Sequence, residues 1–558
     1  MNIHEAAQIT GLSKKALRFY EDKGLIVTVR GDNSYRNYTD EDIDSIKRIK
    51  LLRSIGVSIS DISLLQNNII TLNEVVMQRV KSLQEDMLNN KQQLELCNEI
   101  IDIGDNWNKL VALKSIDLNL DTDIIVYEKN EPVSIGIDIG TSTISLVVID
   151  TAHKPIDIYN IPNNATVKGE IWEHIQDPDI IYSDILKVLR IIEKSHLNIV
   201  SIGLTGQMHG TLYVDSEGNC ASNLRTWLDK SADQLTESGL SFVDEIKLIT
   251  GLDIPAGFGI ATHYALSKKN TRLNSYKLCT IMDYVAMKLS GSKVPVIHYT
   301  NAASFGGYDI VSKKFCSELS RIIDLNILPE IVSDDYICGL YNGVTPVKVA
   351  IGDHQACILG SIGDSTNTLH INIGTGSQIS LCCESTSNVH SEIEIRPHLN
   401  GKYIKCYSAL CGGLSYSLME KFIRRIVNVA TGNDFSQYNT MDQLIRESLP
   451  ANNAPIVEPY FCGTRINANL MGSINCITAN NFDPGSFIIG ILRGIVRELY
   501  EKYLLITNDK CTTIVATGNA VRKNSHLVNI IAETFGCKVQ ISDYSEEAAI
   551  GAAIHALN

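Results

Sequence analysis

The chain has 558 residues, more than one hydrophobic core supports, so we expect several domains. Its composition, 44% hydrophobic and 20% charged, excludes a disordered protein. Its formal net charge of −14 argues against a protein that binds nucleic acid over its whole surface. No apolar run reaches the roughly 18 residues of a membrane span, and the first residues do not resemble a secretory signal, so we expect a cytoplasmic protein with no membrane contact.

The N-terminal segment predicts a helix-turn-helix with a wing. A short helix begins at Ile3, Gly11 lies in a turn, and Ser13 is placed to cap a second helix over 14–22. A polar hairpin at 31–34 then forms the wing. Thr39, with Asp42 three residues later, predicts the start of a third helix over 41–55.

The charge is unevenly distributed along the chain. Residues 1–70 hold ten Lys or Arg and nine Asp or Glu, so the remainder carries about −15 of the net charge. The side chains predicted to face a DNA backbone are Lys14, Lys15, Arg18 and Tyr20. The runs LRFYEDKGL and YRNYTDEDI resemble the DNA-binding domain of the MerR family, and the resemblance implies DNA contacts at Lys15, Arg18, Tyr20, Tyr35 and Arg36.

A heptad pattern follows the head. Apolar residues recur at steps of four and three, with a polar residue at Asn90 on the same seam; they are Val76, Val80, Leu83, Met87, Leu94, Cys97 and Ile101. The pattern predicts one long helix over 73–104 that dimerises as a coiled coil. The alternative is an amphipathic helix packed on the rest of the chain. Residues 105–131 form a linker of undetermined structure.

Two segments of the remaining body match each other. Ser134–Thr143 and Leu369–Ser377 both predict a strand, a tight Gly-Thr turn and a second strand. Such turns expose backbone N–H groups that hold phosphate oxygens. The matching pair predicts a duplicated fold that binds a nucleotide. The phosphate-binding residues would be Asp138, Gly140, Thr141, Ser142, Thr143, Gly374, Thr375, Gly376 and Ser377, with Asp138 also placed to reach Mg²⁺ or its waters.

Other motifs supply the groups for phosphoryl transfer to a sugar. Asp353 follows an apolar strand in GDHQA and can accept a proton from an attacking hydroxyl. Candidate sugar contacts are Gln207, Met208, His209, Trp227 and Asp229. Gly518 and Asn519 form a turn where an adenosine can stack.

In this order the motifs resemble the FGGY carbohydrate kinases of the actin-like ATPase superfamily, over about residues 133–556. The resemblance implies a two-lobed α/β kinase, with a ribonuclease H-like fold in each lobe, that uses ATP and Mg²⁺ and has Asp353 as catalytic base. GQMHG, TWLDK and Gly257–Gly259 favour a sedoheptulose or xylulose kinase. Asp283 is a weaker candidate for sugar contact, with a structural role as the alternative.

We therefore expect a multidomain chain: an all-α winged head (1–72), a coiled-coil helix (73–104), a linker (105–131), an N-terminal lobe (132–365) and a C-terminal lobe (366–558). Two functions remain open. Either the kinase is active and carries its own DNA-binding head, or an idle kinase fold senses sugar and nucleotide for that head. A third possibility is a head that only binds protein. Fourteen cysteines without CxxC spacing predict buried thiols rather than disulfides or metal ligands.

Overall fold

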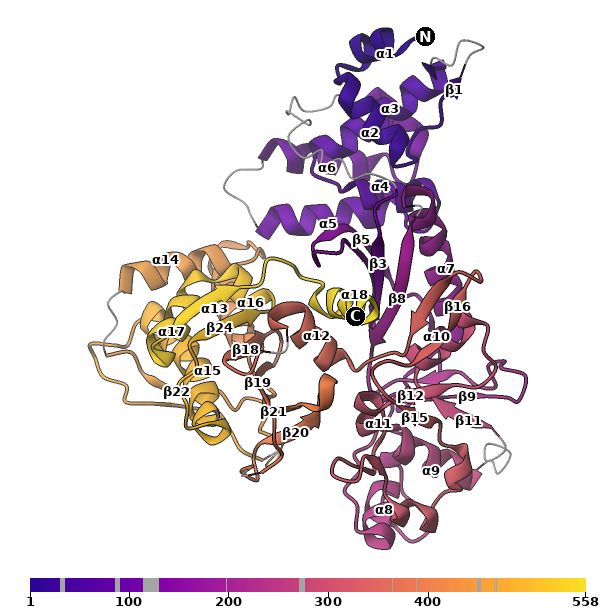
Figure 1. Cartoon of the computed structure of the whole chain (residues 1–558). Helices are drawn as coiled ribbons and strands as arrows, with labels where there is room; N and C mark the ends of the chain where they lie inside the picture. Colours follow the sequence, from indigo (N-terminus) through magenta and orange to yellow (C-terminus); the bar gives the residue numbers. More distant parts are fainter. Residues whose placement is uncertain are drawn as a thin grey trace. The chain divides into compact units, whose positions relative to one another are not determined.

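A computed structural model describes residues 1–30, 36–85, 91–113, 130–196, 198–269, 276–363, 365–387, 389–448, 453–465, 467 and 469–558. They divide into two compact units (Figure 1). Unit 1 contains Met1–Asp309, Lys313–Ala356 and Ala548–Asn558, and unit 2 contains Ile310–Ser312 and Cys357–Glu547. The head and the N-terminal lobe thus belong to one compact unit, whereas the sequence analysis lists them as separate domains.

The head has the predicted helix-turn-helix and wing. Its elements are α1 (Ile3–Thr10), α2 (Lys14–Asp22), β1 (Val29–Arg30), β2 (Arg36–Asn37), α3 (Asp40–Ser54) and α4 (Ile59–Gln66). Gly11 ends α1 in the left-handed conformation, and the Ser13 side chain accepts from the Ala16 N–H to cap α2. Thr39 and Asp42 form the predicted capping box. β1 and β2 pair antiparallel, while the predicted wing turn at 31–34 lies outside the described residues.

The heptad segment is not one long helix, as the seam predicts, but two: α5 (Leu72–Glu85) and α6 (Lys91–Asp102). They run antiparallel, because the Asn73 N–H donates to Asp105 Oδ1 at 2.6 Å and an Arg79 guanidinium N–H donates to Gln93 Oε1 at 3.2 Å. Figure 1 shows the two helices side by side. Seam residues such as Val76 and Cys97 are buried within the chain. Met87 and Asn90 lie outside the described residues.

The seam therefore has an intramolecular partner, which is closer to the alternative of a helix packed on its own chain. The linker contains a short 3₁₀ helix, η1 (Trp107–Ala112).

The N-terminal lobe is built on a six-stranded sheet with the order β16-β17-β8-β3-β4-β5. Its strands are β3 (Val133–Ile139), β4 (Thr143–Ile149), β5 (Pro155–Pro162), β8 (Ile199–Gly206), β16 (Ile337–Tyr341) and β17 (Thr345–Lys348). β3, β4 and β5 form an antiparallel meander, while β8 runs parallel to β3 and β17 parallel to β8.

The C-terminal lobe repeats this plan in the order β20-β21-β19-β18-β24-β25. Its strands are β18 (Thr368–Ile373), β19 (Ser377–Cys383), β20 (Glu394–Pro397), β21 (Tyr403–Ala409), β24 (Thr513–Thr517) and β25 (Lys538–Ile541). Again the first three strands, β18, β19 and β21, form an antiparallel meander. β24 runs parallel to β18, and β25 runs parallel to β24. The predicted duplication is confirmed, with β18 and β19 as counterparts of β3 and β4.

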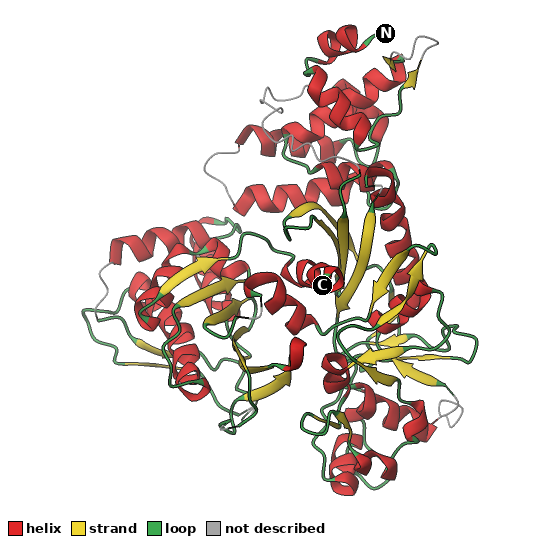
Figure 2. Ribbon diagram, viewed as in Figure 1, coloured by secondary structure: helices red, strands yellow, loops and turns green. Residues whose placement is uncertain are grey.

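Helices cover these sheets (Figure 2). Between residues 130 and 310 they are α7 (Pro178–Ser195), α8 (Phe242–Thr250), α9 (Gly259–Lys269), α10 (Ile281–Ser290) and α11 (Tyr299–Phe305). Those that follow are α12 (Asp353–Ile362), α13 (Gly413–Thr431), α14 (Tyr438–Ser448), α15 (Pro484–Ile506), α16 (Asn519–Lys523), α17 (Ser525–Phe535) and α18 (Glu547–Leu557). The short strands are β6 (Thr166–Val167), β7 (Ile175–Gln176), β9 (Leu212–Val214), β10 (Leu224–Arg225), β11 (Lys277–Cys279), β12 (Val296–His298), β13 (Tyr308–Asp309), β14 (Lys314–Phe315), β15 (Glu330–Val332), β22 (Ile456–Glu458) and β23 (Ser473–Asn475).

Helix α18 lies on the sheet of unit 1, although the sequence places it in the C-terminal lobe. Gly136 and Gly203 allow this approach, because a Cβ at either position would overlap a backbone carbonyl of α18, that of Ala549 or that of Ala552. The Ser134 hydroxyl donates to the Ala553 carbonyl at 2.9 Å. By its contacts, Ala548–Asn558 thus belongs to compact unit 1.

No helix among the described residues is long and apolar enough to cross a membrane. All fourteen cysteines are free thiols, as expected. Five are buried, but Cys462 and Cys476 are exposed, so the prediction of uniform burial is wrong.

Candidate functional site

The first predicted phosphate turn joins β3 to β4 and is fixed by side chains from other segments. Asn163 Nδ2 donates to the Gly140 carbonyl at 2.9 Å, and Gln176 Nε2 donates to the Thr141 carbonyl at 2.8 Å. The Asn163 N–H also donates to the Ser142 carbonyl at 2.9 Å. The sequence interpretation missed Asn163 and Gln176, because no motif marks either residue. With its carbonyls held, the turn has a defined conformation before any ligand binds.

The hydroxyl of Thr141 joins two predicted site residues. It donates to Gln207 Oε1 at 3.3 Å and accepts from Trp227 Nε1 at 3.1 Å. The Gln207 amide donates in turn to Gln176 Oε1 at 2.9 Å. The predicted phosphate turn and two of the predicted sugar contacts therefore lie together in unit 1.

The carboxyl ends of the parallel strands bring Asp353 to the same edge of the sheet. The Gln207 N–H donates to the Ile139 carbonyl at 2.9 Å, so β8 ends beside the first turn. On the other side of β8, the Ile351 N–H donates to the Leu204 carbonyl at 3.0 Å, and the Thr205 hydroxyl donates to the Ile351 carbonyl at 2.9 Å. Ligands of open α/β sheets bind at this edge.

Asp353 is the first residue of α12 and is exposed to solvent. Gly352, just before it, donates its N–H to the Thr300 hydroxyl at 2.9 Å. A Cβ at Gly352 would lie 2.8 Å from Met208 Cε, so Met208 packs directly against this glycine. One predicted sugar contact and the predicted base are therefore neighbours.

His209 is held in an unusual conformation. Its φ of +74° lies in the left-handed region, which a residue other than glycine rarely adopts. The imidazole stacks on Phe258, with ring centroids 4.1 Å apart and 26° between the planes, and its Nδ1 lies 2.8 Å from the Ser304 carbonyl. Backbone strain of this kind concentrates at ligand-binding sites. Phe258 and Ser304 are further site residues that the sequence did not assign.

The indole of Trp227 is 48% exposed, which suits a residue that binds the apolar face of a sugar. The backbone of Gly257, at a φ of +82°, passes so close that a Cβ there would lie 2.9 Å from the carbonyl carbon of Trp227. This contact explains a glycine in the Gly257–Gly259 motif.

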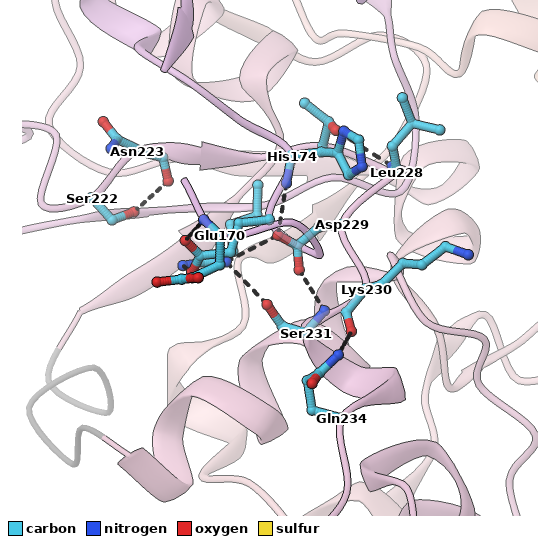
Figure 3. Close-up of polar contacts among 12 residues, drawn as sticks. Glu170, His174, Ser222, Asn223, Leu228, Asp229, Lys230, Ser231 and Gln234 are labelled. Atoms are coloured by element: carbon cyan, nitrogen blue, oxygen red, sulfur yellow. Dashed lines mark hydrogen bonds and ion pairs between the residues drawn. The ribbon is translucent and has the colours of Figure 1, made fainter. Parts of the chain in front are cut away.

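Asp229 does not face the same space as Trp227. Its buried carboxylate accepts from the Ser231 N–H at 2.9 Å and the His174 N–H at 3.3 Å (Figure 3). It also accepts from Arg225 at 2.9 Å, and Arg225 forms a second ion pair with Glu173 at 2.7 Å. The hydrogen bond from Arg225 holds the pKa of Glu173 below its usual value. The predicted direct sugar contact is wrong for Asp229, because its carboxylate instead fixes the loop that carries Trp227.

Asp283 is also structural. Its Oδ2 accepts from the Thr280 hydroxyl at 2.7 Å and forms the capping box of α10. The side chain is buried, and burial raises its pKa to about 7. These contacts are those of the structural alternative, while the sugar contact of Asp283 stays a prediction.

The second predicted phosphate turn lies in unit 2, between β18 and β19. A glycine pair that the sequence interpretation missed holds its backbone: the Gly413 N–H donates to the Gly374 carbonyl at 2.8 Å, and the Gly412 N–H donates to the Thr375 carbonyl at 2.9 Å. The pair of glycines after β21 was the available signal.

Gly518 lies against the same hairpin. Its φ is +91°, and a Cβ there would lie 2.5 Å from the Ile373 carbonyl oxygen, one residue before the turn. Asn519 follows as the first residue of α16. The structure thus brings Gly374, Gly518 and Asn519 together at one end of the second sheet.

The predicted DNA face is only partly as expected. Lys14, Lys15 and Arg18 are exposed on α2. Arg36 forms an ion pair with Glu21. Tyr20 is 2% exposed and belongs to the core of the head, so its predicted DNA contact is wrong. Tyr35 lies outside the described residues.

No cluster of three His, Cys, Asp or Glu side chains that could hold a metal occurs in the described part of the chain. Asp138, partly exposed near the end of β3, supplies one carboxylate beside the first turn. Mg²⁺ in nucleotide sites is usually held by one or two carboxylates, waters and substrate phosphates, so this donor set fits a Mg²⁺ that arrives with a nucleotide.

Family models match three parts of the chain. Residues 1–69 match the MerR HTH family regulatory protein, residues 133–369 the FGGY family of carbohydrate kinases, N-terminal domain, and residues 388–557 the C-terminal domain of the same family.

Individual relatives agree with these matches. A sedoheptulokinase of Homo sapiens is 22% identical over 76% of this chain and 97% of its own length, and a xylulose kinase of Staphylococcus xylosus is 26% identical over 75% and 89%. Among solved structures, a gluconate kinase from Lactobacillus acidophilus has a TM-score of 0.65 at 19% identity, over 76% of this chain and 88% of its own. A ligand-bound xylulose kinase from the same organism has a TM-score of 0.64 at 19% identity, over the same shares. These structures confirm the two-lobed kinase fold.

Proposed function

Since the chain belongs to the FGGY family of carbohydrate kinases and begins with a MerR-type helix-turn-helix domain, we propose that it is a DNA-binding regulator whose body phosphorylates a ketose with ATP. The observation that carries the proposal is the position of Asp353, which is exposed at the carboxyl edge of the sheet and directly follows Gly352, against which Met208 packs. This edge also holds the first turn, Gln207 and Trp227.

In the proposed reaction, the Asp353 carboxylate accepts the proton of a ketose hydroxyl as its oxygen attacks the γ-phosphorus of ATP. The bond between that phosphorus and the β–γ bridging oxygen breaks, and ADP leaves. Position and charge supply most of the catalysis in such transfers. The fixed turn at Gly140–Thr143 would hold phosphate oxygens from unit 1.

The ketose would lie among Gln207, Met208, His209 and Trp227. An exposed indole can cover the apolar face of the sugar, while the Gln207 amide and the His209 imidazole can bond its hydroxyls. Asp229 and Phe258 would act indirectly, by holding Trp227 and His209 in place. The similarity to a sedoheptulokinase and a xylulose kinase supports a ketose substrate.

Within unit 1, Gly140–Thr143 would bind nucleotide phosphates. Within unit 2, Gly374–Ser377 would also bind phosphates, and Gly518 and Asn519 would contact adenosine. Asp138 would hold Mg²⁺ or its waters, and the ion would neutralise phosphate charge during transfer. Asp138 fits this role because it lies one residue before the end of β3, next to the turn.

The head would bind promoter DNA through Lys14, Lys15, Arg18 and Arg36. A homodimer also remains part of the proposal, since regulators of this type bind paired half-sites. It would use surfaces other than the heptad seam, whose described residues are buried within one chain. Sedimentation of the full chain with and without DNA would measure its oligomeric state.

The enzymatic proposal is tested by ATP consumption with sedoheptulose, xylulose and ribulose. Turnover with one of them, lost in Asp353→Asn, would support it. No turnover with any ketose, despite saturable binding of ketose and nucleotide, would favour the second candidate, an idle kinase fold that acts as a sensor. The observation that favours this candidate is the direct attachment of the head to the lobe that carries the proposed sugar site.

DNA footprinting with Asp353→Asn separates the two roles. If ketose and nucleotide still change the footprint when turnover is lost, binding alone is sufficient for regulation. If the change disappears together with turnover, the reaction itself is required.

A further inference from the structure

The head and the N-terminal lobe share one hydrophobic core. A single cluster of buried residues extends from Ala6 in α1 to Ala350 beyond β17. Helix α4 provides the junction, because it packs against both β5 and α7 of the lobe. The head is therefore docked on the lobe by apolar contact as well as joined to it by the linker.

A buried group of charges lies at this junction. Lys23, directly after α2, forms an ion pair with Asp157 of β5, with 2.7 Å between Nζ and Oδ2. His196, directly after α7, places its Nε2 2.7 Å from the same oxygen. The exposed fractions of the Lys23, Asp157 and His196 side chains are 11%, 10% and 2%. The Ser195 hydroxyl also donates to the Lys23 carbonyl at 3.4 Å.

The contacts among Lys23, Asp157 and His196 stabilise the docked position of the head on the N-terminal lobe. Burial by itself would raise the pKa of Asp157, but the hydrogen bond from His196 and the charge of Lys23 outweigh it and lower that pKa. The carboxylate is thus stabilised as an anion only while Lys23 and His196 remain in place. Removing one member of a buried ion pair leaves the other uncompensated, which is strongly destabilising.

Strand β5 connects this group to the first phosphate turn. Asp157 lies near the start of β5, opposite Val148 of β4, and Pro162 at its end lies opposite Thr143, where the turn finishes. The next residue, Asn163, holds the carbonyls of Gly140 and Ser142. One strand therefore carries the anchor of the head at one end and the support of the turn at the other.

The docking leaves the proposed DNA face exposed. Lys14, Lys15 and Arg18 are exposed on α2, while Lys23 at the end of the same helix is buried against the lobe. The Lys23–Asp157 ion pair and the shared hydrophobic core connect β5 to the end of α2. A shift of β5 would therefore move the end of α2.

We propose that β5 couples nucleotide binding at the Gly140–Thr143 turn to DNA binding by the head, through the anchor formed by Lys23, Asp157 and His196. The inference rests on the proposed function and adds the route of regulation. Coupling of this kind is reciprocal, so DNA must change nucleotide affinity by the same factor.

The test uses the full chain, a duplex selected from a random library by the wild-type protein, and the β,γ-imido analogue of ATP with Mg²⁺. DNA affinity is measured with and without the analogue. We expect a change of about fivefold or more in the wild type, and a ratio near one in Lys23→Met and in Asp157→Asn. Matched controls break exposed ion pairs on the same two parts: Lys47→Met in α3 and Asp184→Asn in α7. They should keep the wild-type ratio.

Hydrogen exchange provides a second measurement that needs no ligand. Amides of α2 and α4 should exchange about tenfold faster in Asp157→Asn, and at wild-type rates in Asp184→Asn, because the anchor limits local opening. A single variant leaves one buried charge without its partner and can fail to fold for that reason. The double variant Lys23→Met/Asp157→Asn removes both charges of this ion pair and therefore serves as the second test. It too should lose the coupling.

The outcomes separate the two proposals. A wild-type chain that binds both DNA and the analogue with a ratio of one overturns the coupling but not the proposed function. Full coupling in Asp157→Asn and in the double variant also overturns it. A wild-type chain that binds neither DNA nor nucleotide overturns the proposed function, and the coupling with it.

Discussion

Met208 packs directly against Gly352, where a Cβ would come within 2.8 Å of the methionine Cε. This contact joins the end of β8 to the start of α12, two segments that are far apart in the sequence. Because Asp353 follows Gly352, the contact places a predicted sugar-binding residue beside the backbone that carries the predicted base.

Asp353→Asn should reduce kcat by a factor of about 10² to 10⁴, the usual contribution of a general base, while ketose and nucleotide still bind. Coupled-enzyme assays and thermal shift measure the two effects. Asp253→Asn removes an exposed carboxylate from the same unit and is the control. Turnover within tenfold of wild type in Asp353→Asn would show that another group accepts the proton.

Gly257→Ala should raise the KM for the ketose, because the new methyl group would displace the carbonyl of Trp227 and with it the indole. Gly251→Ala is a matched control: its φ of +78° is similar, but no atom lies within 4 Å of its Cβ position. We expect the control to lose only about 1–2 kcal/mol of stability from the left-handed backbone. Equal KM values in the two variants would contradict a role for Trp227 in sugar binding.

Gly518→Ala should weaken nucleotide binding, because its methyl group would press on the Ile373 carbonyl next to the second turn. Gly536→Ala, with a φ of +64° and open space around the Cβ position, gives the baseline. Titration with fluorescent ADP measures both. The proposed nucleotide site in unit 2 is wrong if Gly518→Ala binds ADP as tightly as its control.

Lys15→Gln and Arg18→Gln should each reduce the salt dependence of DNA binding by about one unit in the slope of log K against log salt, since each would remove one phosphate contact. Lys47→Gln, on α3, should leave the slope unchanged. Tyr20→Ala should lower the stability of the head, because this ring is buried in its core. A slope unchanged in both α2 variants would place the DNA face elsewhere.

Asp283 predicts a pH dependence of stability. Its pKa is raised to about 7 by burial, whereas the unfolded side chain titrates near 4. Between these values the folded chain binds more protons than the unfolded chain, so this group lowers the free energy of unfolding as pH rises, by roughly 1.4 kcal/mol per unit. Above pH 7 its effect is constant. The difference in Tm between Asp283→Asn and wild type should therefore grow from pH 4 to 7 and then level off; a constant difference would contradict the raised pKa.

Local signals gave correct predictions where the structure depends on neighbours in sequence. Ser13 and Thr39 cap the helices that they were expected to cap, and both Gly-Thr turns join the predicted strands. The alternation of apolar residues in these strands was sufficient to place them.

The errors concern partners that are remote in sequence. The heptad period of Val76 to Ile101 does not reveal whether the apolar face packs on another chain or on a helix that folds back. Tyr20 is followed by two acidic residues, Glu21 and Asp22, and was predicted to face DNA, but the shared core covers it. Neither Asn163 nor Asp157 has a motif, because their roles arise only when β5 is placed between the head and the turn.

The position of α18 has a consequence for synthesis on the ribosome. The Ser134 hydroxyl in β3 bonds the Ala553 carbonyl, 419 residues later. The glycine-lined face of the first sheet must stay uncovered until that helix emerges from the exit tunnel, so the N-terminal lobe cannot complete its core during translation. A chain that ends before residue 547 would therefore have its head attached to a lobe with an incomplete core.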